Sequence, residues 1–201
     1  MESPTRSVCG LGAGLLLLAT CLLSGGAAAE SRETWLLIDT DNLTLSVMRG
    51  EAVLHTFDNI AIGSNGATRH KRAGDEKTPL GEFRITAIRG DSRFHRFLAI
   101  DYPTLEDARR GLGDGRISRD EYDRVRRAWE SGGVPPQDTS LGGHLGIHGI
   151  GAGDPAVHDA FNWTNGCIAL TDIQVEELLQ WVRVGTRVSV RQPPLPGGDA
   201  N

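Results

Sequence analysis

Short runs of apolar residues alternate with polar ones from about residue 35 to residue 190. Alternation with a period of two is typical of a strand with one buried face, and residues 81–88 are the clearest case. Turn-forming residues separate the runs, as in Asp39-Thr40-Asp41-Asn42, which predicts a turn between the first two strands. Strands are predicted at residues 35–38, 43–48, 52–57 with 60–62, 81–88, 97–100, 145–148, 167–170 and 187–190.

Helical patterns are fewer and shorter. A capping box at residues 118–121 predicts a helix that runs to about Glu130, and residues 105–110 predict a shorter one. A second box at residues 171–174 predicts a helix through Trp181. Its apolar side is expected to carry Ile173, Leu178, Leu179 and Val182. The pattern therefore predicts a mainly β fold with a few short helices.

The first 29 residues have the order of a secretory signal peptide. Arg6 precedes an apolar run that ends at Leu23, and small residues lead to a predicted cleavage site after Ala29. The apolar run is short for a membrane span. An uncleaved signal anchor and lipid attachment at Cys21 remain alternatives. Export to the periplasm or cell envelope is the expectation, with membrane contact only through an uncleaved signal segment.

The chain after the signal has the length and composition of one domain. Roughly 170 residues allow a sizeable core, which we place at residues 34–191, followed by a flexible tail at 192–201. The formal net charge of −5 does not fit a general nucleic-acid binder. Removal of the signal would also remove Cys9 and Cys21, so one thiol would remain, that of Cys167.

A lone thiol in an exported protein has no disulfide partner, and Cys167 lies nineteen positions after His148. A thiol and an imidazole that meet in space are the minimum of a cysteine nucleophile site. Asn165-Gly166 predicts a turn that places Cys167 at the start of a strand, where the amides of Gly166 and Cys167 could form an oxyanion hole. The alternatives are a buried structural cysteine and a core histidine.

Two possible metal motifs fail on their residue types and spacing. In the Asp114–Glu121 segment, an EF-hand alignment on Gly115 puts Arg110 and Leu112 at positions that require oxygen ligands. A glycine turn before a capped helix explains the same residues. His144 and His148 would lie about 13 Å apart on a strand, too far to share one ion directly. We therefore expect no metal and no cofactor.

With these residues in view, the chain resembles the L,D-transpeptidase (YkuD-like) catalytic domain family, bacterial cell-wall cysteine enzymes with a mainly β fold of the sandwich or barrel type. The resemblance rests on Ile147-His148-Gly149, on Gly166-Cys167-Ile168 and on residues 74–83, which contain Lys77-Thr78-Pro79, and it covers most of residues 34–191. It implies Cys167 as nucleophile, His148 as base and the carbonyl of Gly149 as the group that orients the imidazole. It also implies attack on a peptidoglycan stem peptide to give a thioester. Independently of the family, a neighbouring imidazolium lowers the pKa of a thiol, so we expect a reactive thiolate near neutral pH.

Two positions depart from the common family pattern. Asn165 stands where histidine or arginine is usual, although Thr164 fits, and Ala169 stands where an arginine often follows the isoleucine. The Gly-Cys-Ile-Ala form resembles a subgroup that includes a peptidoglycan–lipoprotein amidase. Three functions thus stay open: transpeptidation, hydrolysis of the same thioester (with a wall-attached lipoprotein as a possible partner), and a non-catalytic peptidoglycan-binding module.

Several nearby residues have more than one interpretation. The basic run at residues 69–72, with Lys77, predicts a solvated loop or an anchor for the carboxylates of stem peptides. Trp163 either forms a wall of the site or simply packs. The sequence assigns no role to His158 and Asn162, which lie between the predicted base and nucleophile.

Overall fold

The computed structural model describes residues 33–193. The predicted signal peptide, with Cys9 and Cys21, and residues 194–201 of the predicted tail lie outside the described residues. Strands form most of the regular structure. They are β1 (Thr34–Asp39), β2 (Thr44–Arg49), β3 (Ala52–Phe57), β4 (Ala67–Thr68), β5 (Thr78–Pro79), β6 (Gly81–Ser92), β7 (His95–Ile100), β8 (Gly146–His148), β9 (Ile168–Ala169) and β10 (Arg187–Arg191). The helices are α2 (Leu105–Gly113), α3 (Arg119–Glu130), α4 (Pro155–Ala160) and α5 (Asp172–Leu178).

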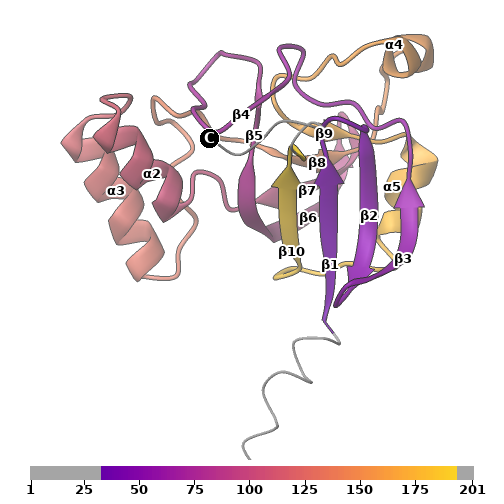
Figure 1. The fold of residues 1–201 in the computed structure, drawn as a ribbon, viewed down its shortest axis with the longest axis horizontal. Helices are drawn as coiled ribbons and strands as arrows, with labels where there is room; N and C mark the ends of the chain where they lie inside the picture. Colours follow the sequence, from indigo (N-terminus) through magenta and orange to yellow (C-terminus); the bar gives the residue numbers. More distant parts are fainter. Residues whose placement is uncertain (1–32, 194–201) are drawn as a thin grey trace, which may run out of the picture.

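Eight strands form one sheet in the order β3-β2-β1-β10-β6-β7-β8-β9, and β4 pairs with β5 separately. The pairs β1–β10 and β8–β9 are parallel, and the other pairs of the large sheet are antiparallel. The long strand β6 joins the two halves, because Gly81–Arg84 pairs with β10 and the rest pairs with β7. The sheet folds over at β6, so that β1, β2, β3 and β10 lie in front of β6, β7 and β8 (Figure 1).

The core lies between these two halves. One hydrophobic cluster contains Leu36 and Ile38 from β1, Val188 from β10, and Leu98 from β7, all fully buried. The two ends of the sheet also meet, because the segment after β3 bonds to β9: the Ala61 amide donates to the Ala169 carbonyl at 2.9 Å and the reverse bond is 2.8 Å. The fold is thus a mainly β sandwich that approaches closure, as predicted.

The predicted strands are confirmed because their apolar positions face this core. In β1 and β2, buried residues alternate with partly exposed ones. The turn between them is held by Asp39, whose carboxylate accepts hydrogen bonds from the amides of Asp41 and Asn42 at 3.0 and 2.9 Å. Residues 60–62 form only an isolated bridge, at Ala61, rather than a strand of their own.

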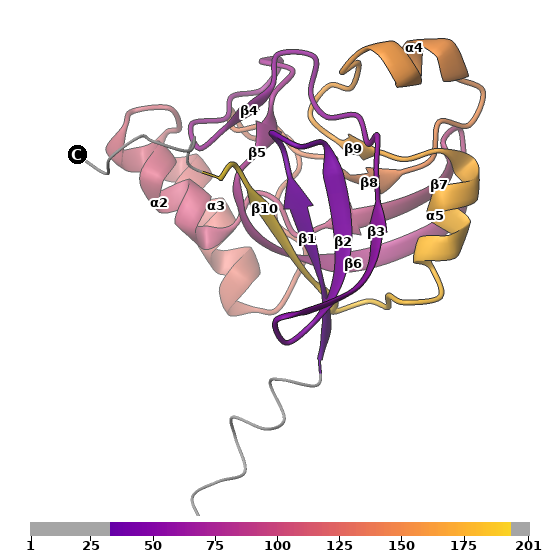
Figure 2. The same ribbon diagram turned by 45° about the vertical axis from the view of Figure 1, so that its right-hand side comes forward.

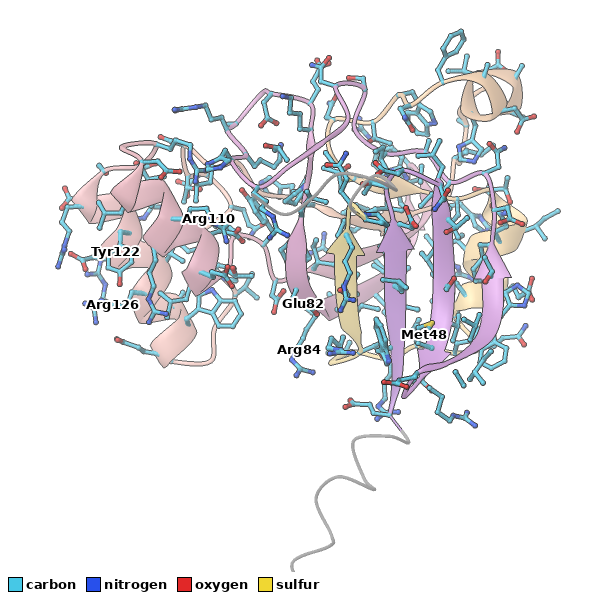
Figure 3. All side chains as sticks on the ribbon, viewed as in Figure 1. Met48, Glu82, Arg84, Arg110, Tyr122 and Arg126 are labelled. Atoms are coloured by element: carbon cyan, nitrogen blue, oxygen red, sulfur yellow. The ribbon has the colours of Figure 1, made fainter. Side chains whose placement is uncertain are left out.

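The helices α2 and α3 form a pair at one side of the sheet (Figure 1). The Ser118–Glu121 capping box is present and starts α3 as predicted, after a turn in which Gly115 has φ +66°. Helix α2 is longer than predicted, because Thr104 and Asp107 form a capping box of their own and the helix ends at Gly113. Figure 3 shows Tyr122 and Arg126 on the side of this pair away from the sheet.

Helix α5 lies along the edge of the sandwich beside β3 and β7 (Figure 2). Its predicted capping box, Thr171 with Gln174, is present. Two details of the prediction are wrong. The helix ends at Leu178 rather than Trp181, and Ile173 is 82% exposed, because Val175 occupies the buried side instead.

The sequence did not predict α4 or the small β4–β5 sheet. Helix α4 has only six residues, capped by Asp154 with Pro155 at its first turn, so it carries too little periodicity to detect. Strands β4 and β5 pair over two residues each. Both features lie on the upper side of the molecule as drawn, around β8 and β9 (Figures 1 and 2). Within residues 33–193, no helix is both long enough and apolar enough to cross a membrane.

Candidate active site

The structure brings His148 and Cys167 into one cavity. His148 ends β8 and Cys167 directly precedes β9, and these two short strands are parallel neighbours. The cavity has a volume of about 330 Å³. It is lined by Arg93, Phe94, Phe97, Gly143, His144, Leu145, His148, Trp163, Thr164, Asn165 and Cys167.

The imidazole of His148 is held rigidly. It is 1% exposed, and its Nδ1 lies 2.7 Å from the carbonyl oxygen of Gly149. A carbonyl can only accept, so Nδ1 carries the proton and Nε2 is left as the basic nitrogen of a neutral ring. The ring stacks on Phe94 with centroids 4.1 Å apart, and Trp163 meets it edge-on at 5.8 Å.

Burial sets the protonation of His148. It lowers the pKa of the imidazole below its ordinary value of 6.5, against the opposing effect of the Gly149 carbonyl. The positive charge of Arg93 lowers it further. His148 is therefore neutral at neutral pH and free to accept a proton.

Trp163 both lines the cavity and packs within the fold. Its indole N–H donates to Nδ1 of His158 at 3.3 Å, and His158 is 3% exposed. The pKa of His158 is lowered by burial, which favours the neutral ring that this bond needs. His158, to which the sequence assigned no role, thus fixes the indole that meets His148. Asn162 accepts a hydrogen bond from the Ile62 amide at 3.0 Å.

Cys167 is a free, half-buried cysteine that lines the cavity. Its thiol lies 3.8 Å from the carbonyl oxygen of His144, as a weak donor. Burial raises the pKa of this thiol to about 11, although a hydrogen bond from the Gly146 amide and the charges of Lys71 and Arg93 act in the opposite direction. Burial thus disfavours the charged form of both groups, whereas the sequence led us to expect a thiolate formed beforehand by an imidazolium.

The turn before the nucleophile is fixed by Thr164, which is 3% exposed. Its hydroxyl donates to the Cys167 carbonyl at 2.7 Å and accepts from the Gly166 amide at 3.1 Å. The Gly166 amide is therefore engaged within the turn, so it is not available to an oxyanion, contrary to the expectation from the sequence. Gly166 has φ +116°, and a Cβ there would lie 2.5 Å from the Lys77 carbonyl oxygen.

The basic run differs from its predicted solvated state at one position. Arg69, His70 and Arg72 are exposed, but Lys71 is only 4% exposed and packs next to Gly166. Lys77, predicted as a substrate-binding residue, does not line the cavity, and its main-chain carbonyl contacts Gly166 instead.

Two further cavities adjoin the first. One, of about 480 Å³, shares Arg93, Phe94, Phe97, His144 and Leu145 with it and is closed by Val134 and Gln137 from the loop after α3. The other, of about 280 Å³, shares Gly143, Leu145 and Asn165 and includes Lys71. The three cavities together form one groove, and Cys167 lines the middle cavity. The sequence carried no signal for Arg93, Phe94 or Gln137, because their chain segments are remote from the motif.

A metal ion has no evident place in this groove. Within residues 33–193, no group of three or more histidine, cysteine, aspartate or glutamate side chains is arranged to hold one. His144 is not on a strand, since it precedes β8 with φ +56°. The cavity instead holds a thiol and an imidazole from two adjacent chain segments, the pair of groups that a cysteine nucleophile requires.

A comparison with models of known protein families identifies the family of the chain. The family model of the YkuD L,D-transpeptidase catalytic domain matches residues 33–190. The chain belongs to this family, which consists of peptidoglycan-acting enzymes. A comparison with curated proteins gave no match.

Solved structures share the fold at low sequence identity. The helical cell shape determining protein Pgp2 from Campylobacter jejuni (K307A mutant) is 19% identical with a TM-score of 0.55, over 82% of this chain and 49% of that one. Bd1075 from Bdellovibrio bacteriovorus is 18% identical with a TM-score of 0.51, over 83% of this chain and 50% of that one. The chain thus spans about half the length of these proteins.

Proposed function

We propose that this chain is an exported cysteine acyltransferase that acts on peptidoglycan stem peptides, with Cys167 as nucleophile and His148 as base. One observation supports this most directly: the thiol and a neutral, buried imidazole share one cavity, and the imidazole Nδ1 is held by Gly149. That arrangement leaves Nε2 to take the thiol proton.

In the first half of the reaction, Nε2 of His148 takes the Cys167 proton as the sulfur attacks the carbonyl carbon of the donor peptide. The tetrahedral oxyanion is stabilised by main-chain donors, among which we assign the Cys167 amide, since Gly166 donates to Thr164. Collapse breaks the C–N bond, and the imidazolium gives its proton to the departing amine. The product is a thioester on Cys167.

In the second half, the acceptor amine takes the place of the leaving group. His148, neutral again, removes a proton from the amine as it attacks the thioester. The new amide forms, the C–S bond breaks, and the thiol recovers its proton from the imidazolium. Water in place of the amine gives hydrolysis by the same steps.

The groove supports an anionic peptide as substrate. In the described part of the chain, the residues that line its two larger cavities include Arg89 and Arg93 but no acidic residue. Both arginines are exposed, and the Arg93 guanidinium lies 4.5 Å from the centroid of the Phe94 ring. We propose that these arginines bind carboxylates of the stem peptide, while Phe97 and Leu145 contact its aliphatic parts. A stem peptide in this groove also implies a location in the cell envelope or periplasm.

The first experiment compares the mature protein with Cys167→Ala on defined tetrapeptide muropeptides and on cross-linked sacculi, with the products identified by mass spectrometry. Cysteine-dependent dimers, or exchange of the terminal residue for an added amino acid, are the expected products. An acylated wild-type protein, trapped by rapid acid quenching, should carry the added mass on the peptide that contains Cys167.

Other products would change the assignment. Cysteine-dependent loss of cross-links or of a wall-attached lipoprotein, without exchange, would make the chain a hydrolase or amidase of the kind suggested by the Gly-Cys-Ile-Ala form. Identical products from both proteins would overturn the catalytic proposal for these substrates, and wall binding that survives Cys167→Ala would then indicate a binding module.

A further inference from the structure

Lys71 is a buried cation that the proposed reaction does not use. It lies in the loop between β4 and β5, among residues that are otherwise mostly exposed, yet its side chain is only 5% exposed. Its Nζ is 2.5 Å from Asp75 Oδ1 and 3.4 Å from the Arg72 carbonyl oxygen. Burial of a charged group is costly unless it is paired, so this placement needs a reason.

Asp75 holds the side chain of Lys71 in place. Its carboxylate also accepts hydrogen bonds from the amides of Arg72 at 2.7 Å and Lys77 at 3.0 Å. Burial acts to raise the pKa of Asp75, but the hydrogen bonds from Lys71 and from these two amides outweigh it and hold the pKa below its usual value. The carboxylate is therefore ionised at neutral pH, and the ammonium of Lys71 balances it.

The helical pair holds the same loop from the other side. The Arg116 guanidinium, almost fully buried, donates to the Lys71 carbonyl at 2.8 Å. Arg110 donates to the Arg69 carbonyl at 3.0 Å, and the Ala73 amide donates to the Ser140 carbonyl at 2.9 Å. Lys71 is thus clamped at its main chain by residues of the α2–α3 region and at its side chain by Asp75.

The clamped ammonium lies against the turn that presents the nucleophile. A Cβ built on Gly166 would be 3.3 Å from Lys71 Nζ, so the ammonium packs directly beside the residue that precedes Cys167. Lys71 also lines the 280 Å³ cavity that joins the catalytic one at Asn165. In the ion pair, the ammonium is the group that contacts the turn.

Within residues 33–193, the charged and polar groups that act on the Cys167 thiol include the His144 carbonyl at 3.8 Å, the Gly146 amide and the cations Lys71 and Arg93. The neutral His148 lies in the same cavity. Arg93 is exposed and its charge is screened by water, whereas Lys71 is buried and held by its ion pair with Asp75. Burial works against ionisation of the thiol, so a fixed internal cation has most to contribute as the sulfur becomes negative.

We propose that Lys71, anchored by Asp75, is a positioning residue for the nucleophile: its buried ammonium supports the Gly166–Cys167 turn and provides a fixed positive charge that favours the ionised sulfur. This inference rests on the proposed role of Cys167. It assigns a function to the loop between β4 and β5 and to the helical pair that holds it.

The test measures the rate of Cys167 alkylation by iodoacetamide as a function of pH, which requires no substrate and no turnover. In Lys71→Met the apparent pKa of the thiol should rise by about one unit, and alkylation below that pKa should slow about tenfold. Lys71→Arg, which keeps the charge, should recover most of the rate. Arg72→Met removes a neighbouring exposed charge and should leave the pH profile unchanged.

A second variant serves as the control in case Lys71→Met does not fold. Lys71→Met/Asp75→Asn removes both charges with little change of volume, so no carboxylate is left buried without a partner, and the thiol pKa should rise in the same direction as in Lys71→Met but by less. A folded neutral variant with the wild-type pH profile would overturn the proposal, and so would an equal shift in Arg72→Met. Because alkylation reports only on the thiol, the pH profile can be interpreted even if the protein shows no acyl transfer.

Discussion

The proposed base and the proposed nucleophile of this site are held by different kinds of interaction. His148 is enclosed by aromatic rings and bonded to one carbonyl, and burial keeps it neutral. Cys167 stands on a turn fixed by hydrogen bonds and lies beside a buried ion pair, and it lines the cavity. The base is thus specified by packing and the nucleophile by polar contacts. Packing tolerates small changes of shape, whereas a polar turn depends on each of its partners.

The largest effect is expected when the base is removed. His148→Gln leaves no group to accept the proton of a thiol whose pKa burial raises to about 11, so thioester formation should fall at least about 10³-fold. Intact-protein mass spectrometry after rapid quenching measures this rate. His70→Gln, which changes an exposed histidine outside the groove, serves as the control. A loss of less than tenfold in His148→Gln would assign the proton to another group.

A methyl group at Gly166 should displace the turn that carries Cys167 and leave the surroundings of His148 unchanged. Gly166→Ala places a Cβ 2.5 Å from the Lys77 carbonyl oxygen at φ +116°, so the turn must move. The expected cost is about 1–3 kcal/mol in the free energy of unfolding, with a large loss of thioester formation. Urea unfolding measures the former. Gly113→Ala has no atom within 4 Å of its new Cβ and should unfold like the wild type.

Removing an aromatic ring beside His148 should change the pKa of its imidazole without displacing Cys167. Burial is the main cause of the lowered pKa of His148, so Phe94→Ala, which admits water to the ring, should raise that pKa toward 6.5. Since only the neutral imidazole accepts a proton, the acidic limb of the kcat/KM profile should move to higher pH. Phe161→Ala, at a 68% exposed ring, should leave the limb in place. Movement of the acidic limb to lower pH in Phe94→Ala would contradict burial as the cause of the lowered pKa of His148.

The smallest effect concerns the helical pair that supports the nucleophile side. Glu121 accepts hydrogen bonds from the amides of Ser118 and Ser140 at 2.8 and 2.6 Å. Burial opposes ionisation, but these bonds prevail and lower the pKa of Glu121 from 4.5 to about 2. Its stabilisation is therefore present above pH 4.5 and is lost as the pH falls through about 2.

Glu121→Gln should lower the free energy of unfolding by about 1 kcal/mol at pH 7 and by less at pH 3. Urea unfolding at the two pH values gives both numbers, and Glu130→Gln, at an exposed residue of the same helix, is the matched control. An equal loss at both pH values would mean that the charge of Glu121 does not contribute.

Local patterns predicted most of the framework. The alternating strands and the boxes at Ser118 and Thr171 are signals within a few residues, and the structure confirms them. Prediction failed where the signal was short or the environment distant. Helix α4 has too few residues for a period, and Ile173 lies in the first turn of α5, where the helix faces solvent. The sequence placed Lys71 in a solvated loop or in an anchor for substrate carboxylates, because nothing in its own segment indicates a contact with Gly166 or Arg116.

The sequence by itself determined the candidate chemistry: a lone thiol after a glycine turn, a histidine before a glycine, and strands that could bring them together. Only the tertiary structure decided the burial and the electrostatic surroundings of the thiol and the imidazole. The rings around His148 come from the β6–β7 hairpin and from Trp163, and the ion pair beside Gly166 comes from the loop between β4 and β5. Burial and charge are properties of what surrounds a group in space, and chain segments far apart in sequence provide those surroundings.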